Sequence, residues 1–323
     1  MIKLGIIGTS NITDEFLSAI KLSSKFELSA IYSRTLEKGT AFAEKYGNIP
    51  VFTDFESMVK SGIEAIYIAS PNSFHYAQSK FFIEHKINVI CEKPIVCSSD
   101  EYVELKSLAD KNNVIYMEAI MSVHCDSYDI IHKALKEISN ISVARIDFCQ
   151  RSSRLDDFYA GKKHNIFDMS FHAGTLMDLG IYCVYGAVDL FGLPNKITAN
   201  AHYFDNGCDR SGISVFEYDK FSAVLTYSKT AQSYIHSEIV GDNGTLCIDS
   251  ISQYAGIKLF KNGKETILYK TPDKPEIMRG EVDAFYSFIT GEQSEKYIAK
   301  SVLCKNVHSC MDEIKKSAKI KYN

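Results

Sequence analysis

The chain opens with Lys3-Leu4-Gly5-Ile6-Ile7-Gly8-Thr9-Ser10-Asn11-Ile12-Thr13, an apolar run that leads directly into a turn of small and polar residues. A strand that enters a helix through such a turn presents backbone N–H groups and a helix N-terminus, which favour a phosphate. Only Gly8 of the G-x-G-x-x-G pattern is present, because Ser10 and Thr13 stand at its other two glycine positions. The turn therefore predicts a pyrophosphate site, with simple capping of the helix as the structural alternative.

Up to residue 118 the sequence alternates apolar runs with helical stretches, which is typical of parallel β-α units. The expected strands are 3–8, 28–33, 65–70, 88–91 and 114–117, and the expected helices are 13–22, 36–46, 54–60, 74–84 and 99–111. We therefore expect residues 1–118 to form an α/β domain with a parallel sheet.

Beyond residue 118 the pattern changes to short strands joined by polar turns such as Asp242-Asn243-Gly244, which favours antiparallel pairing. A long polar loop extends to Asn165. The expected strands are 142–150, 197–204, 214–218, 223–228, 235–240, 245–248, 257–260 and 266–269, and the expected helices are 128–138, 175–191, 281–289 and 301–316. We expect residues 119–323 to form an α+β domain with a large, mostly antiparallel open sheet. We expect the outer face of this sheet to be available for contact with a second copy of the chain. The last helix of the domain can pack back on the first domain.

The composition is that of a soluble globular protein, with 46% hydrophobic and 24% charged residues. The 36 basic and 40 acidic side chains leave a net charge of −4, which argues against nucleic-acid or anionic-membrane binding. No apolar run approaches the ~20 residues of a membrane span, so we expect a cytoplasmic protein.

Nine cysteines are scattered from Cys91 to Cys310 without a C-x-x-C pair, which predicts neither a disulfide framework nor a zinc site. The run His124-Cys125-Asp126 holds three metal-ligand types, but consecutive side chains project in different directions. We expect no bound metal.

A second informative stretch is Cys91-Glu92-Lys93-Pro94, which closes the apolar run 87–90. A lysine at the carboxyl end of a parallel strand points into the crevice where such sheets bind ligands. Together with the Gly8 turn, Lys93 suggests redox chemistry on a nicotinamide cofactor.

The end of the second strand indicates which cofactor is used. Proteins that prefer NAD usually place an acidic residue there, whereas this chain has Ser33-Arg34-Thr35. The guanidinium of Arg34 suits a 2′-phosphate or the adenine face, so NADP is favoured over NAD. The alternative is that Arg34 is an ordinary solvated loop residue.

Four motifs in this order resemble the glucose-fructose oxidoreductase and inositol dehydrogenase (Gfo/Idh/MocA) family of NAD(P)-dependent oxidoreductases. They are Gly5-Ile6-Ile7-Gly8, Ser70-Pro71-Asn72 followed by His75, Cys91-Glu92-Lys93-Pro94, and Asp178-Leu179-Gly180-Ile181-Tyr182. The resemblance implies an N-terminal Rossmann domain, a C-terminal α/β domain whose open sheet serves oligomer contacts, a site between the domains, and Lys93 beside the nicotinamide.

Family members often carry D-x-x-x-H in the second domain, where this chain has Asp178 and Tyr182. That tyrosine, and Met117-Glu118-Ala119, look like the dihydrodiol and xylose dehydrogenase branch. The segment 122–126 departs from that branch, which tends to have an aromatic and arginine-containing segment there, so the wall of the substrate site is expected to differ.

Oxidation of an alcohol requires an acid/base near the substrate hydroxyl, and Lys93 and Tyr182 are the candidates. We favour Tyr182 as the acid/base, Lys93 as the group that orients and polarises the substrate oxygen, and Asp178 as the group that fixes the lysine. Asp178 and Tyr182 are four residues apart on an expected helix and therefore share a face. The sequence leaves open which of Lys93 and Tyr182 takes the proton.

The remaining candidates surround these groups. His75 lines the nicotinamide pocket or bonds a backbone carbonyl, and Glu92 anchors the lysine loop or forms a structural salt bridge. The long loop 151–171 and the residue after it offer Arg154, Asn165 and His172 to a polyhydroxylated substrate. The expected cofactor-binding set is Gly8, Thr9, Ser10, Asn11, Ile12, Ser33, Arg34, Ser70, Pro71, Asn72, His75, Glu92 and Lys93.

The resemblance implies an NAD(P)-dependent dehydrogenase or reductase that acts on a sugar, cyclitol or related hydroxy or carbonyl compound, assembled as a homodimer or higher homo-oligomer. Two alternatives are a catalytically silent NAD(P)-binding regulator and an NAD-retaining, glycosidase-type relative. The substrate itself and the physiological direction are not determined by the sequence.

Overall fold

The computed structural model describes residues 1–322. The chain forms two compact units, one of Met1–Ile120 with Asp273–Ser301 and one of Met121–Pro272 with Val302–Asn323. The first unit thus takes in a segment from near the end of the chain.

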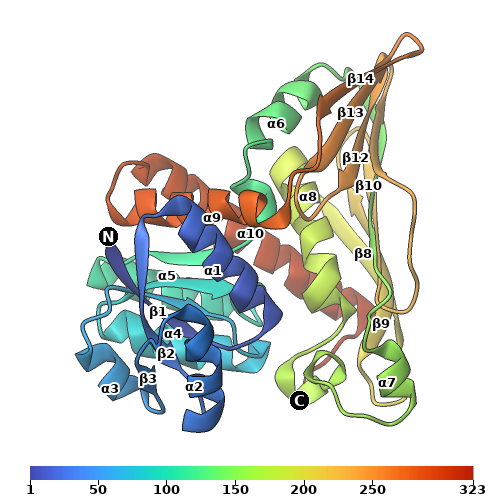
Figure 1. The fold of residues 1–323 in the computed structure, drawn as a ribbon. Coiled ribbons are helices and arrows are strands. Elements are labelled where there is room, and N and C mark those ends of the chain that lie inside the picture. The colour runs from blue at the N-terminus through green and yellow to red at the C-terminus, as the bar shows by residue number, and fades with distance from the viewer. Residues whose placement is uncertain (323) are drawn as a thin grey trace. The chain divides into compact units, whose positions relative to one another are not determined.

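The first unit is built on a six-stranded parallel sheet in the order β3-β2-β1-β4-β5-β6. Figure 1 labels β1, β2 and β3 of this sheet. The strands are β1 (Ile2–Ile7), β2 (Phe26–Tyr32), β3 (Val51–Phe52), β4 (Ala65–Ile68), β5 (Asn88–Glu92) and β6 (Tyr116–Ala119). This is the doubly wound order of dinucleotide-binding domains, and it confirms the predicted parallel sheet. The two-residue strand β3 was not predicted, because it is too short to show an apolar pattern.

The register aligns the carboxyl ends of the central strands. Ile7 lies opposite Tyr32 of β2 on one side and opposite Ile68 of β4 on the other, and Ile68 in turn lies opposite Cys91. The residues that follow these strands therefore emerge at the same edge of the sheet, where such folds bind ligands.

Helices connect the strands of the first unit: α1 (Asn11–Ser23), α2 (Leu36–Ala43), α3 (Phe55–Lys60), α4 (His75–Glu84), α5 (Ser99–Asn112), α9 (Lys274–Ile289) and the start of α10 (Ser294–Ala318). Ser98 and Glu101 form a capping box that fixes the start of α5. The later segment joins this unit where Asp283 of α9 accepts a 2.5 Å hydrogen bond from Ser23 and Phe285 stacks on Phe26 at 5.7 Å.

The second unit contains an eight-stranded sheet in the order β14-β13-β12-β11-β7-β10-β9-β8. Its strands are β7 (Ile141–Cys149), β8 (Lys196–Tyr203), β9 (Asp209–Glu217), β10 (Ser222–Ser228), β11 (Ser237–Gly241), β12 (Gly244–Ser250), β13 (Ala255–Lys261) and β14 (Lys264–Tyr269). The sheet is mostly antiparallel, as predicted, although β10 pairs with β7 in parallel.

Buried and partly buried side chains alternate along the strands of this sheet, and the buried ones mark the face that the helices cover. Ala223, Leu225 and Tyr227 of β10 are buried, whereas the residues between them are only partly buried. The helices of this unit are α6 (Tyr128–Lys136), α7 (Leu155–Tyr159), α8 (Ile181–Phe191) and the second half of α10. Figure 1 shows α6 and α8 on the same face of the sheet.

Two predicted elements of the second unit differ from the structure. The expected polar loop up to Asn165 contains α7, whose Leu155 packs in an apolar cluster with Phe167 and Phe204. The expected single helix 175–191 begins with a π-helical turn, Leu176–Gly180, before α8. Segment Met169–Phe191 is long and apolar enough to cross a membrane, but 78% of its apolar 18-residue window is buried inside the protein, as the core helix of a soluble protein also is.

Candidate functional site

The turn that carries Lys93 is held at three successive residues of the first unit. The N–H of Lys93 donates to Glu92 Oε2 at 3.3 Å, and the N–H of Ile95 donates to Glu118 Oε1 at 2.7 Å. Between them, His75 Nδ1 lies 2.8 Å from the carbonyl oxygen of Pro94. Three side chains from β5, β6 and α4 thus fix the backbone on which Lys93 is mounted.

Glu92, a partly buried residue, precedes Lys93 and supports its backbone. Tyr67 Oη donates to its Oε1 at 2.7 Å. Burial raises the pKa of Glu92, while the hydrogen bond from Tyr67 and the charge of Lys93 act in the opposite direction. Of the two roles considered from the sequence, these contacts support anchoring of the lysine turn.

His75 is fully buried and joins two turns, because its Nε2 also lies 2.8 Å from the carbonyl oxygen of Ser70. Burial lowers the pKa of His75, so the ring is favoured in its neutral form and can donate from only one nitrogen at a time. The structure therefore shows the carbonyl contacts that formed one alternative. That His75 also lines a nicotinamide pocket stays a prediction.

The turn between β1 and α1 has the shape of an anion cradle. Gly8 adopts φ +108°, and a Cβ atom there would lie 2.5 Å from the carbonyl oxygen of Ala69. Ser10 is the N-cap of α1, but its side chain does not cap the helix, and Thr9, Ser10 and Asn11 are exposed. The first N–H groups of a helix have no acceptor within it, so those of Asn11 and Ile12 suit a pyrophosphate.

The other expected cofactor residues follow neighbouring strands. Ser33 is buried after β2 and donates its N–H to Phe52, while Arg34 next to it is exposed. After β4, Ser70 Oγ donates to Gln78 at 2.7 Å, and Pro71 precedes the short helical turn Asn72–Phe74. The chain thus places the whole expected set at the carboxyl edge of one sheet, and these residues fit a dinucleotide.

In the second unit, Asp178 lies in the π-helical turn and Tyr182 in the first turn of α8. The ring of Phe148 lies 5.6 Å from that of Tyr182. Gly180 lets the π-helical turn pack closely against β10, because a Cβ there would lie 3.2 Å from the Tyr227 ring. π-Helical turns are often found at functional sites.

Lys229 is a residue that the sequence analysis did not single out. Its Nζ lies 3.0 Å from Asp178 Oδ2, and its side chain is only 2% exposed. The signal that could have identified it is the one used for Lys93, because Lys229 also follows an apolar strand directly.

The three expected substrate residues have different surroundings. Arg154 is exposed at the start of α7, and Asn165 is exposed at the start of the helical turn Asn165–Phe167. His172 adopts φ +51°, and its ring lies 5.3 Å from that of Tyr322. Their role in substrate binding stays a prediction.

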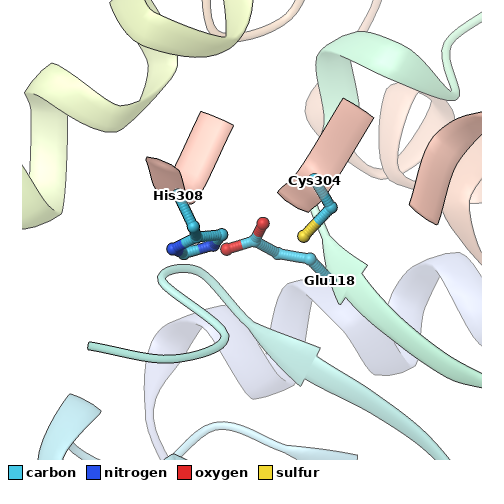
Figure 2. A group of neighbouring side chains, drawn as sticks. All are labelled: Glu118, Cys304 and His308. Carbon is cyan, nitrogen blue, oxygen red and sulfur yellow. The ribbon is translucent and has the colours of Figure 1, made fainter. Parts of the chain in front are cut away.

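Possible metal-ligand types occur at two further places. Figure 2 draws three buried residues of these types, which are Glu118 of β6 and, one turn apart on α10, Cys304 and His308. Glu118 already accepts the Ile95 N–H, so we assign it to the lysine turn. In the sequence run 124–126, Cys125 Sγ donates to the Ser122 carbonyl at 3.1 Å, and burial raises the pKa of this thiol, as expected for a structural cysteine.

Comparison with known families matches both parts of the chain. The model described as an oxidoreductase family with an NAD-binding Rossmann fold matches residues 2–120, and the GFO/IDH/MocA C-terminal domain matches residues 135–247.

Relatives extend the match over the full length. The scyllo-inositol 2-dehydrogenase (NADP(+)) IolU of Bacillus subtilis is 36% identical over 328 residues, covering 100% of this chain and 98% of the relative. The uncharacterized oxidoreductase YgjR of Escherichia coli is 35% identical over 290 residues, covering 90% and 88%. Among solved structures, the 3-ketoreductase KijD10 of Actinomadura kijaniata with NADP and TDP-benzene has the same fold, with a TM-score of 0.85 at 18% identity over 98% and 97% of the two chains.

Proposed function

Because the chain belongs to the GFO/IDH/MocA oxidoreductase family, we propose that it is an NADP-dependent dehydrogenase that interconverts a hydroxyl group of a cyclitol or sugar with the corresponding ketone. The observation that carries the proposal is the Lys93 turn, which is held rigidly at the carboxyl edge of a dinucleotide-binding sheet. The full-length similarity to a dehydrogenase named for scyllo-inositol and NADP(+) supports the substrate class and the cofactor.

We assign the following roles to the residues of the site. A bound nicotinamide supplies the hydride acceptor. The Gly8 turn and the start of α1 hold the pyrophosphate, and Arg34 binds the 2′-phosphate. Tyr182 takes the hydroxyl proton as the substrate is oxidised, Lys93 orients and polarises the substrate oxygen, and Asp178 keeps the role expected from the sequence, which is to fix the lysine.

Relatives that carry dehydrogenase names favour this enzyme over a silent regulator or a glycosidase-type protein. A screen of the purified chain with NADP⁺ or NAD⁺ and a panel of scyllo-inositol, other cyclitols and xylose tests the choice. We expect formation of reduced cofactor with at least one polyol. Cofactor binding without turnover across the panel would favour a regulator, and glycoside cleavage without net cofactor change would favour the glycosidase type.

The role of Arg34 has its own test. Arg34→Ala should raise the KM for NADP⁺ by about 10-fold or more, because a charge-assisted hydrogen bond contributes ~1.5–3 kcal/mol. The KM for NAD⁺ should change little, and exposed Lys38→Met is the matched control for loss of a nearby charge. An equal effect on both cofactors would contradict a 2′-phosphate contact.

We also propose a cytoplasmic homodimer that forms through the outer face of the second sheet. The nine free cysteines suit a reducing compartment, and cell fractionation tests the location.

The proposed dimer interface is the outer face of the second sheet. Ile213, which is 44% exposed, lies there with Val215 and Val224, on the face opposite the buried Phe216. Light scattering should show a dimer that Ile213→Glu weakens, whereas a monomeric wild type would contradict the proposal.

A further inference from the structure

Lys229 is a buried cation within the second unit, placed just after the end of β10. Its ammonium group lies 3.0 Å from Asp178 Oδ2, donates to the carbonyl oxygen of Ile166 at 3.0 Å, and lies 5.4 Å from the centre of the Phe167 ring. A lysine this deeply buried requires compensating partners. Asp178 supplies the opposite charge.

The two members of this ion pair differ in exposure. The side chain of Asp178 is 37% exposed, whereas that of Lys229 is 2% exposed. Lys229 therefore holds one carboxylate oxygen from the interior, while part of Asp178 remains accessible. The most direct route by which Lys229 can act on a reaction is therefore through Asp178, the charged partner that remains accessible.

The helix that carries Asp178 is held at a second point by Asp209 of the neighbouring strand β9. Asp209 is fully buried, its Oδ2 accepts the Leu176 N–H at 2.7 Å, and its carbonyl oxygen accepts Thr175 Oγ1 at 2.9 Å. The N–H of Lys229 donates to the Arg210 carbonyl at 3.1 Å, which ties the two strand ends together. The π-helical turn is thus held by Asp209 at its start and by Lys229 at Asp178, one helical turn before Tyr182.

We propose that Lys229 is a positioning residue of the dehydrogenase, which fixes the Asp178 carboxylate and through it the π-helical turn that leads into Tyr182. This inference rests on the function proposed above. Lys229 does not contact substrate; it acts by keeping Asp178 and the start of α8 in one arrangement, as preorganised sites require.

A double-mutant cycle of Lys229→Met and Asp178→Asn, assayed with NADP⁺ and the best polyol of the screen, tests the link. Lys229→Met should lower kcat by about 100-fold, with the dissociation constant for NADP⁺ changed by less than about threefold. The double variant should be no slower than Asp178→Asn alone. Lys196→Met, which removes an exposed ion pair to Glu217 of the same unit, is the matched control and should retain wild-type kcat. Multiplying losses in the double variant, or a Lys229→Met kcat like that of the control, would overturn the proposal.

Amide hydrogen exchange gives a readout that does not depend on turnover. Lys229→Met should speed exchange in the segment 175–182 relative to Lys196→Met, and unchanged protection there would refute the positional link. If the wild type turns over no polyol, the proposed function fails, and hydrogen exchange alone still decides this inference.

A second pair of variants applies if Lys229→Met does not fold. Lys229→Arg keeps the charge, whereas Lys229→Gln keeps only hydrogen-bond donors. Positioning through the ion pair predicts a higher kcat and stronger protection for the arginine variant. An equal or reversed order would overturn the proposal.

Discussion

Lys93 owes its proposed role to neighbours that fix its backbone. Glu92, His75 and Glu118 contact the peptide groups of Lys93, Pro94 and Ile95 in turn. A reactive amine on a turn that is fixed in this way does not have to be ordered again in each reaction cycle, which lowers the entropic part of the barrier. The contribution of the supporting side chains to turnover can therefore be tested by mutation, like that of the lysine itself.

Glu118→Ala should destabilise the first unit by ~1–3 kcal/mol and lower kcat, because it leaves the buried N–H of Ile95 without its acceptor. Glu118→Gln is the matched control, since its amide oxygen can still accept this bond. Urea unfolding and steady-state kinetics of both variants provide the measurement. Equal losses in the two variants would show that the charge, not the hydrogen bond to the turn, is what matters.

At the scale of elements, the passage from β1 to α1 combines close packing with an open helix end. The turn can pass this close to the end of β4 only because residue 8 has no side chain. Exposed residues then lead into the first turn of the helix, where N–H groups are oriented toward an anion. The same glycine thus serves both the packing and the cradle.

Gly8→Ala should weaken NADP binding by about 10-fold or more and lower the unfolding free energy by ~1–3 kcal/mol, because both φ and the Ala69 contact oppose a Cβ atom. Isothermal titration and urea unfolding measure the two effects. Gly62→Ala is the matched control, because this exposed glycine also has a positive φ but a Cβ there would meet nothing within 4 Å, so NADP affinity should stay that of the wild type. Wild-type affinity in Gly8→Ala would argue against this turn as the pyrophosphate site.

For the molecule as a whole, buried ionisable groups determine how stability depends on pH. Burial raises the pKa of Glu281 well above its usual value, and the nearby Glu92 carboxyl raises it further. Its Oε2 has no hydrogen-bond partner within residues 1–322. In the folded state Glu281 therefore binds a proton more tightly than in the unfolded chain, so it favours folding below the unfolded-state pKa of ~4.3 and loses that contribution as pH rises through the folded-state pKa.

Glu281→Gln should accordingly stabilise the protein more at about pH 8 than at about pH 5, because the variant has no proton to lose; each pH unit inside the window is worth ~1.4 kcal/mol. Urea unfolding at both values measures the difference. Glu276→Gln, which removes a carboxylate from the first turn of the same helix, is the control. A stability gain that is independent of pH would contradict an elevated pKa for Glu281.

How much of the structure the sequence predicts depends on whether the deciding residues are close together in the chain. Gly8 and Lys93 were identified because they stand directly after apolar runs, and the order of strands and helices places such residues at one edge. Lys229 stands directly after a strand as well, but its ion pair with Asp178 could not be predicted, because the two residues are distant in sequence and only the fold brings them together.

Two remaining differences between the expected and the observed helices have local causes. The π-helical turn was not predicted because its apolar pattern is that of an ordinary helix. Helix α9 begins at Lys274 rather than at 281, because its proline lies in the first turn, where proline is tolerated.

The most direct test of the central claim compares the wild type with Lys93→Met and Tyr182→Phe in NADP⁺ reduction by the best polyol. We predict that each variant loses at least about 100-fold in kcat, while NADP⁺ still binds with an affinity within a few-fold of that of the wild type. Tyr159→Phe, at a tyrosine that is 60% exposed, should behave as wild type. Near-normal turnover in Lys93→Met would contradict the account.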